Sequence, residues 1–171
     1  MTAGQVIAAV SGALPQPVAD DVLLSFLQGE ENKISRAMAT NRRSQTLIAT
    51  GGVAPLPDYI HPHRIYRVVH AGGDVGYLAA PGVLQVPCNG SIGVVYAPLV
   101  PPLTQSSCLL AGEEGAQLYF YSLMASSCLL LGDIAGYNNY TTLYQQQYQT
   151  LCRQWAGAAA GGRQPWGVKL C

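Results

Sequence analysis

Charged side chains are scarce in this sequence. Only 11% of its 171 residues are Asp, Glu, Lys or Arg, against roughly a quarter in ordinary soluble domains. A free monomer of this composition would have few charges with which to cover its surface. The deficit indicates either a membrane protein or a subunit whose surface is mostly covered by other subunits.

Long apolar runs are also missing, which argues against the membrane. The longest run, residues 118–131, is broken by Ser122, Ser126 and Ser127, and it falls short of the roughly 18–20 residues that a membrane span needs. The start of the sequence shows no basic segment followed by an apolar core and a cleavage site. We therefore expect no membrane partner, and a protein made and kept in a cytoplasm.

Clustered basic residues are absent as well. The formal net charge is zero and the pI is near 6.8, whereas broad electrostatic binding of DNA or RNA needs clustered Lys and Arg. Any contact with nucleic acid is therefore expected to be passive. No glycine-rich phosphate-binding loop is present, and we expect no cofactor.

Residue types that bind metals gather at one place only. His61 and His63 flank Pro62, with Asp58 and His70 nearby. Imidazoles two positions apart face the same side only in a regular strand, and a proline between them disturbs that regularity. We therefore predict a loop with exposed histidines and no metal site. The five cysteines show no C-x-x-C spacing, and we expect them to act as small apolar residues.

Candidate nucleophiles are weakly supported. Ser91 lies in a sequence that resembles a nucleophile elbow, but Asn89 stands where the first glycine is required. Cys108 would need a histidine that nothing in the sequence places beside it. We therefore do not expect an enzyme. A small cytoplasmic hydrolase or transferase that uses Ser91 or a Cys/His pair is the alternative from a different class, and a binding module with a tyrosine-lined site is a third.

Two helical patterns follow each other in residues 115–155. Apolar residues occupy every side of the first, residues 115–131, whereas the second, residues 134–155, carries one stripe rich in tyrosine with glutamines away from it. Gly132 can end the first helix as a left-handed cap, and Asp133 can accept from the free N–H groups of the second. So short a connection predicts a long antiparallel hairpin.

Two more helices are predicted nearer the N-terminus, at residues 2–12 and 18–40. Thr2 and Gln5 form a capping box for the first, and Pro17 suits the first turn of the second. Between the two helical parts, residues 44–98 show short strand-like pieces separated by Gly and Pro. Hairpin turns are predicted at Gly72-Gly73 and at Asn89-Gly90.

These elements predict an α+β fold that is mainly α. We expect residues 1–155 to form a single domain, a helical bundle with a long antiparallel hairpin and an inserted small antiparallel β-sheet. Residues 156–162 are rich in Ala and Gly, as in a flexible linker. Beyond them we predict a docking arm. Its candidate contact residues are Arg163, Trp166, Val168, Lys169 and Leu170.

The order of these parts resembles a known family. Leu56-Pro57-Asp58 precedes a strand, Tyr96-Ala97-Pro98 follows one, and the run from Leu118 to Leu123 leads into Leu131-Gly132-Asp133. In this order they are similar to the head-to-tail adaptor (connector) proteins of tailed bacteriophages. The resemblance covers roughly residues 6–155 and is one of pattern, without an invariant signature.

The resemblance implies a structural virion protein. Such proteins form a ring, usually of twelve subunits, that binds the portal of the filled capsid at the head–tail junction, extends the DNA channel and presents a platform for the tail or nozzle. The expected partners are thus other copies of this chain, the portal and tail proteins, with packaged DNA passing nearby. Another neck or tail-completion ring is the closest alternative.

A helix that is apolar on every side, in a chain poor in charge, is also what a subunit packed between two ring neighbours should have. We therefore expect part of the helix at residues 115–131 to contact neighbouring subunits. We expect the same of the basic pair that follows the predicted helix at residues 18–40. The candidates are Tyr119, Phe120, Leu123, Met124, Arg42 and Arg43.

Overall fold

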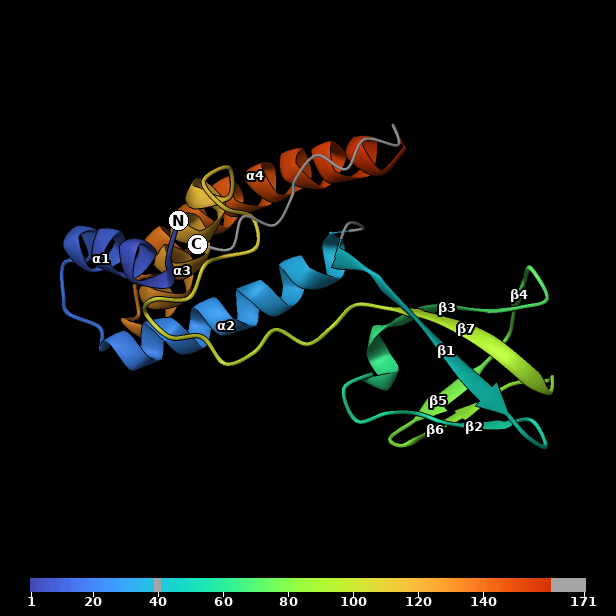
Figure 1. Cartoon of the computed structure of the whole chain (residues 1–171). Coiled ribbons are helices and arrows are strands. Elements are labelled where there is room, and N and C mark those ends of the chain that lie inside the picture. The colour runs from blue at the N-terminus through green and yellow to red at the C-terminus, as the bar shows by residue number, and fades with distance from the viewer. Residues whose placement is uncertain (39–40, 161–171) are drawn as a thin grey trace. The chain divides into compact units, whose positions relative to one another are not determined.

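A computed structural model of the chain describes residues 1–38 and 41–160, the last four of these by their backbone only. The chain divides into two compact units (Figure 1). The helical unit comprises Met1–Thr40 and Val100–Cys171, and the β unit comprises Asn41–Leu99. The described residues combine four α-helices with small antiparallel sheets, which confirms the predicted α+β class.

The helices of the helical unit are α1 (Ala3–Ala13), α2 (Asp20–Ala37), α3 (Ala116–Leu130) and α4 (Ile134–Ala160). The capping box of α1 is present in both directions, because the Thr2 hydroxyl accepts from the Gln5 N–H at 3.3 Å and the Gln5 side chain accepts from the Thr2 N–H at 2.8 Å. It satisfies two of the N–H groups that a helix start leaves free.

Helix α2 is shorter than predicted, since the pattern indicated residues 18–40. It begins at Asp20, after Val18 has packed into the core in an extended segment. Asp20 and Asp21 lie in its first turn, where negative charge is favourable because of the helix dipole. Its end comes early because Met38 already has an extended backbone, with φ −73° and ψ 109°.

The end of α3 follows the predicted cap. Gly132 has a φ of +78°, the Asp133 N–H donates to the Cys128 carbonyl at 2.8 Å and the Gly132 N–H donates to the Leu129 carbonyl at 3.2 Å. These bonds make a Schellman motif. Asp133 then accepts from the Gly136 N–H at 2.8 Å and so caps α4.

Helix α4 extends beyond the predicted end at Trp155 and reaches Ala160. The prediction of a flexible linker was therefore wrong for residues 156–160. Alanine has the highest intrinsic helix propensity, so an Ala-rich segment continues a helix that has already been nucleated. The rest of the predicted linker and the whole docking arm lie outside the described residues.

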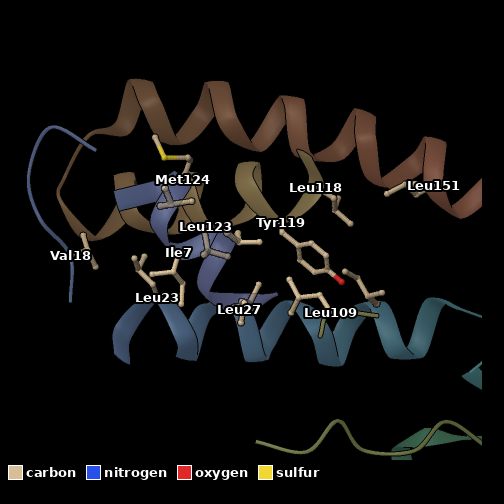
Figure 2. Close-up of a cluster of buried hydrophobic side chains, with 14 of the residues drawn as sticks. Ile7, Val18, Leu23, Leu27, Leu109, Leu118, Tyr119, Leu123, Met124 and Leu151 are labelled. Atoms are coloured by element: carbon tan, nitrogen blue, oxygen red, sulfur yellow. The ribbon is translucent and has the colours of Figure 1, made fainter. Parts of the chain in front are cut away.

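Helix α3 lies against the three other helices of its own unit. Leu118, Tyr119 and Leu123 are fully buried there, and Figure 2 shows these side chains lying between α2 and α4. Because α3 has almost no polar face, this enclosure by its own chain accounts for its composition.

The β unit contains the 3-10 helix η2 (Pro62–Arg64) and, among the described residues, two antiparallel sheets. The four-stranded sheet has the order β1-β7-β3-β4 and the three-stranded sheet has the order β2-β6-β5. Alternate residues of the strands form a separate apolar core that includes Ala54, Val68, Leu84, Ile92 and Val94. The strands are β1 (Arg43–Ala49), β2 (Val53–Pro55), β3 (Ile65–His70), β4 (Gly73–Val75), β5 (Leu78–Ala80), β6 (Val83–Gln85) and β7 (Gly90–Tyr96).

One predicted hairpin is confirmed with a shifted turn, and the other is wrong. Strands β3 and β4 pair, but the turn consists of Ala71 and Gly72, with φ values of +49° and +84°. Strands β6 and β7 do not pair, because β6 lies between β2 and β5 while β7 lies between β1 and β3. Asn89 instead accepts from the Gly52 N–H at 3.0 Å, which ties the connection between the sheets to the β1–β2 turn.

Two glycines of the helical unit should respond oppositely to alanine. Gly29 lies inside α2 with open space where a Cβ atom would lie, so Gly29→Ala should raise the free energy of unfolding by about 0.5–1 kcal/mol. Gly132 has an equally open surrounding but a left-handed backbone, so Gly132→Ala should lower it by about 1–2 kcal/mol. Urea denaturation of both variants measures these changes, and changes of the same sign would contradict the assigned cap.

Candidate functional site

Two adjacent carboxyl groups are buried in the helical unit. Glu30 and Glu31 lie in α2 between Leu27 and Ile34, on the side of the helix that faces the core. They are only 7% and 1% exposed. Burial of ionisable groups carries a large desolvation cost unless polar partners surround them, so their partners define the most unusual polar site in the described part of the chain.

Glu31 is held by α3 and by the segment before it. The Tyr119 hydroxyl donates a hydrogen bond to its carboxyl group. The Leu110 N–H lies 3.2 Å from each of its oxygens. The Tyr119 hydroxyl in turn accepts from the Ala111 N–H at 3.0 Å. One tyrosine thus links the buried carboxyl group to a backbone turn.

Glu30 is held by α3 and α4. It accepts from the Ser122 hydroxyl at 3.0 Å and from the Tyr144 hydroxyl at 2.7 Å. Lys33 donates to the same Tyr144 hydroxyl, and its ammonium group lies 4.4 Å and 4.7 Å from the ring centroids of Tyr144 and Tyr148. Those two rings stack at 5.8 Å. Tyr144 therefore connects a buried carboxylate to an exposed cation.

Burial dominates the electrostatics of this cluster. Desolvation raises the pKa of Glu31 above its ordinary value of 4.5, although the bonds from Tyr119 and Leu110 lower it. Desolvation, followed by the nearby Glu31, raises the pKa of Tyr119 well above 10.0. Desolvation and the bond to Glu30 likewise raise the pKa of Tyr144, and desolvation raises the pKa of Tyr148 to about 12. The tyrosines therefore stay protonated as hydrogen-bond donors near neutral pH.

This arrangement holds helices together more readily than it performs chemistry. The bonds of Glu30 and Glu31 reach both α3 and α4, so they fix how these two helices lie against α2. The two surface hollows described below are lined by other residues. We name Glu30, Glu31, Tyr119, Ser122 and Tyr144 the carboxylate–tyrosine cluster.

The expected interface residues of α3 are mostly not at the surface. Tyr119, Leu123 and Met124 are 0%, 0% and 3% exposed and contact other helices of the same chain. Their prediction as subunit contacts is therefore corrected, because α1, α2 and α4 cover the side of α3 on which they lie. Phe120 is half-buried beside the rings of Tyr121 and Tyr140 and stays a candidate.

The two basic interface candidates are exposed and lie in the β unit. The Arg42 guanidinium lies over the Tyr66 ring, 4.1 Å from its centroid. Arg43 is the first residue of β1 and pairs with Tyr96 of β7. Neither residue lies in a helix, and their role in contacts with a neighbour stays a prediction.

Among the described residues, neither the candidate metal ligands nor Ser91 forms the site considered for it. The rings of His61 and His63 are 5.5 Å apart, and no group of three potential ligands forms among the described residues. Ser91 lies within strand β7, and the nearby His70 Nδ1 contacts its backbone carbonyl oxygen at 3.1 Å. The structure thus lacks the strand–turn–helix context that an elbow needs at Ser91. Cys108 belongs to the helical unit and the histidines to the β unit.

The described part of the helical unit exposes a group of large apolar side chains at the end of α3. Leu129, Leu130 and Ile134, which we name the α3–α4 tip, are 52%, 58% and 57% exposed. Elsewhere on the same unit α1 and α3 form an apolar hollow of about 310 Å³, which we name the α1–α3 groove. It is lined by Met1, Gln5, Val6, Ala9, Ala116, Gln117, Phe120 and Tyr121. Apolar surfaces of this kind mark contact sites more often than single exposed residues do.

The β unit has an apolar outer face of its own. Val53 and Leu78 both flank Gln85, and Val83 lies two pairs further along the three-stranded sheet. These three apolar side chains are exposed. Val53 and Leu78 border a shallow hollow of about 500 Å³, whose lining also includes Gly51, Gly52 and Gly76.

Sequence reasoning missed the carboxylate–tyrosine cluster, although a signal was present. Leu27, Glu31 and Ile34 recur at helical spacing, so Glu31 occupies a core position of α2. A charged residue on an apolar stripe suggests a buried polar contact. The partner could not be read in the same way, because Tyr119 lies 88 positions away.

Comparison with known proteins adds no family. Neither a protein-family model nor a curated protein sequence matches this chain. Among the described residues, none of the helices has both the length and the apolar character that crossing a bilayer requires.

Removing the Tyr119 hydroxyl should destabilise the helical unit. Tyr119→Phe leaves the Ala111 N–H without its acceptor and removes one donor from Glu31, so we expect a loss of about 2 kcal/mol in the free energy of unfolding. Tyr121→Phe, two positions along the same helix at a half-buried site, is the control and should change it by at most about 0.5 kcal/mol. Urea denaturation measures both, and equal effects would show that the hydroxyl bond is unimportant.

The pH dependence of stability should reveal Glu31. Its folded pKa is raised above the 4.5 of the unfolded chain, so its contribution to stability is fully present below pH 4.5 and is lost as the pH rises through the folded pKa. The free energy of unfolding of the natural chain, relative to that of Glu31→Gln, should therefore fall as the pH rises above 4.5 and then level off. Denaturation across this range tests the sign, and parallel curves would contradict it.

Proposed function

We propose that this chain is a structural virion protein of the head-to-tail adaptor class. In this proposal, copies of the chain close into a ring at the junction of capsid and tail, usually of twelve subunits in proteins of this class. The ring binds the portal, extends the DNA channel and presents a platform for the tail or nozzle. Its role is structural, because it binds the portal on one side and offers the tail a binding surface on the other. This role requires no catalytic residue.

The observation that carries the proposal is the scarcity of charge on α1 and α4, together with the exposed α3–α4 tip. Helix α1 contains no charged residue, and α4 contains Arg153 alone. The α3–α4 tip exposes three large apolar side chains. A surface of this kind is typical of a subunit that other proteins cover.

The arrangement of parts supports the same proposal. The β unit is inserted between two segments that together make the helical unit, which matches the order of parts on which the resemblance rests. We assign the finer fold as a helical bundle in which α3 and α4 form a long antiparallel hairpin. Residues 161–171 would supply the arm that docks onto the portal, with Trp166 as its anchor.

The α3–α4 tip alone is too small to hold free copies together. Complete burial of a Leu or Ile side chain contributes about 1.5–3 kcal/mol, and the three tip residues are already half-buried. Their contact therefore contributes roughly 3 kcal/mol, less than the 4–15 kcal/mol that association costs by the usual estimates. Assembly by this surface would need further contacts, such as those that a portal provides to many copies at once.

Mass photometry with the portal encoded in the same genome tests the proposal. The chain alone should be monomeric, and addition of portal should give a complex that carries many copies. Trp166→Ala should weaken this binding if the arm is the anchor. Arg153→Ala, at an exposed position of α4, is the control and should leave the binding unchanged. A chain that stays monomeric with portal and tail proteins alike would overturn the proposal.

A further inference from the structure

One face of α4 has almost no charge and no large apolar side chain. It consists of the exposed residues between positions 138 and 154, which recur at helical spacing. We name it the amide face. Six of its nine residues carry a side-chain amide, and Arg153 is the one charged member. The nine are Asn138, Asn139, Thr142, Gln145, Gln146, Gln149, Thr150, Arg153 and Gln154.

The two threonine hydroxyls of the amide face are engaged by the helix itself. Thr142 Oγ1 donates to the Asn138 carbonyl oxygen at 2.9 Å, and Thr150 Oγ1 donates to the Gln146 carbonyl oxygen at 3.0 Å. Their protons are therefore used within α4. What the face offers to a partner is mainly neutral amide groups.

The amide face shares only its scarcity of charge with a protein interface. The centre of such an interface is enriched in aromatic residues, methionine and arginine. The aromatic residues of α4 lie on its other side, where Tyr140, Tyr144 and Tyr148 pack against the core. A surface that faces only water, in contrast, has roughly a quarter to a third of its residues charged. The face therefore suits a partner that requires neither apolar nor charged side chains.

Duplex DNA that must slide is such a partner. It carries one negative charge per roughly 1.7 Å of its axis. Clustered lysines and arginines displace its counterions and bind it tightly, whereas carboxylates repel it. Neutral amides do neither, because they leave the counterions in place and keep the wall hydrated. DNA can then move along the wall without being held.

The amide face is also long enough to form part of a channel wall. From position 138 to position 154 of α4 it extends for roughly 24 Å at 1.5 Å per residue. A duplex presents roughly 14 phosphate charges over that length. One arginine in each copy neutralises few of them, so binding stays weak.

We propose that the amide face of α4 lines the DNA channel of the assembled ring, with sliding duplex DNA as its occupant. The inference rests on the proposed function, because it assigns to one helix face the channel that an adaptor ring would extend. It agrees with the lack of clustered basic residues in the sequence, since passive contact with DNA requires a wall without such clusters.

Lysine substitution in portal-bound assemblies tests the assignment. Gln146→Lys with Gln149→Lys adds two cations per copy to the amide face. Ser44→Lys with Thr46→Lys adds two at exposed positions of β1 and is the matched control. The probes are a linearised plasmid, which can thread a channel from its end, and the same plasmid as a nicked circle, which cannot. Filter binding at several salt concentrations measures the affinity for each.

The α4 variant should bind the linear plasmid at least about tenfold more tightly than the natural chain does at about 50 mM salt. Most of this gain should disappear by about 200 mM salt, because it comes from counterion release. The nicked circle should show no such gain, since the added lysines would lie inside the channel. The β1 control should bind both plasmids alike. Mass photometry checks that both variants load the portal.

Photo-cross-linking gives a second readout that leaves the charge of the face unchanged. A diazirine amino acid replaces Gln146 or, as the control, Thr46 of β1, which is also exposed. The assemblies are placed on DNA-filled capsids, so that DNA occupies the channel. Illumination should cross-link position 146 to DNA, and position 46 should give much less of this product.

The outcomes separate the channel wall from the proposed function. The channel assignment would be overturned, and the adaptor function would stand, if the α4 variant bound linear and circular plasmid alike on a loaded portal. Cross-linking of position 146 to protein alone would do the same, as would an equal preference for linear DNA in the β1 control. A natural chain that never loads the portal would overturn both.

Discussion

The helical unit depends on the enclosure of α3. This helix has apolar residues on nearly every side, so exposure of any long stretch of it to water would be costly. Three other helices of the same chain lie against it, and they leave exposed mainly the last turn with Leu129 and Leu130. The same constraint thus accounts for the core of the unit, and the last turn of α3 is the part of this helix that stays exposed.

The carboxylate–tyrosine cluster adds specificity to this enclosure. Apolar packing alone tolerates sliding of one helix along another, whereas a buried carboxyl group is satisfied only when its donors are in place. Glu31 needs Tyr119 of α3, and Glu30 needs Tyr144 of α4. A slip of these helices would take the tyrosine donors away from the buried carboxyl groups. The cost of burying Glu30 and Glu31 is therefore offset only in one arrangement of α2, α3 and α4.

Local signals in the sequence were sufficient for some features and insufficient for others. The Thr2 capping box and the Gly132 cap follow from a few neighbouring residues, and both are present. The hairpin at Asn89-Gly90 is also predicted from local preference, yet β6 and β7 belong to different sheets, because strand pairing is decided by the buried faces of distant segments.

The partners of Glu31 depend on contacts across 79 and 88 positions, which the periodicity of the sequence cannot predict. For the same reason, the sequence indicated that α3 is buried but could not distinguish burial within its own chain from burial against neighbouring subunits.

This distinction changes what the scarcity of charge means. Most of the apolar surface of α3 is accounted for by its own chain, so it no longer serves as an argument for assembly. What still needs an explanation is the surface of the helices that cover it, because α1 has no charged residue and α4 has one, whereas α2 has six. A helix that faces only water gains from charged residues, which oppose association of its exposed surface with other proteins. The uncharged exteriors of α1 and α4 are therefore the feature that favours coverage of these two helices in an assembly. The α1–α3 groove and the α3–α4 tip lie on the uncharged helices α1 and α3 or at the turn into α4.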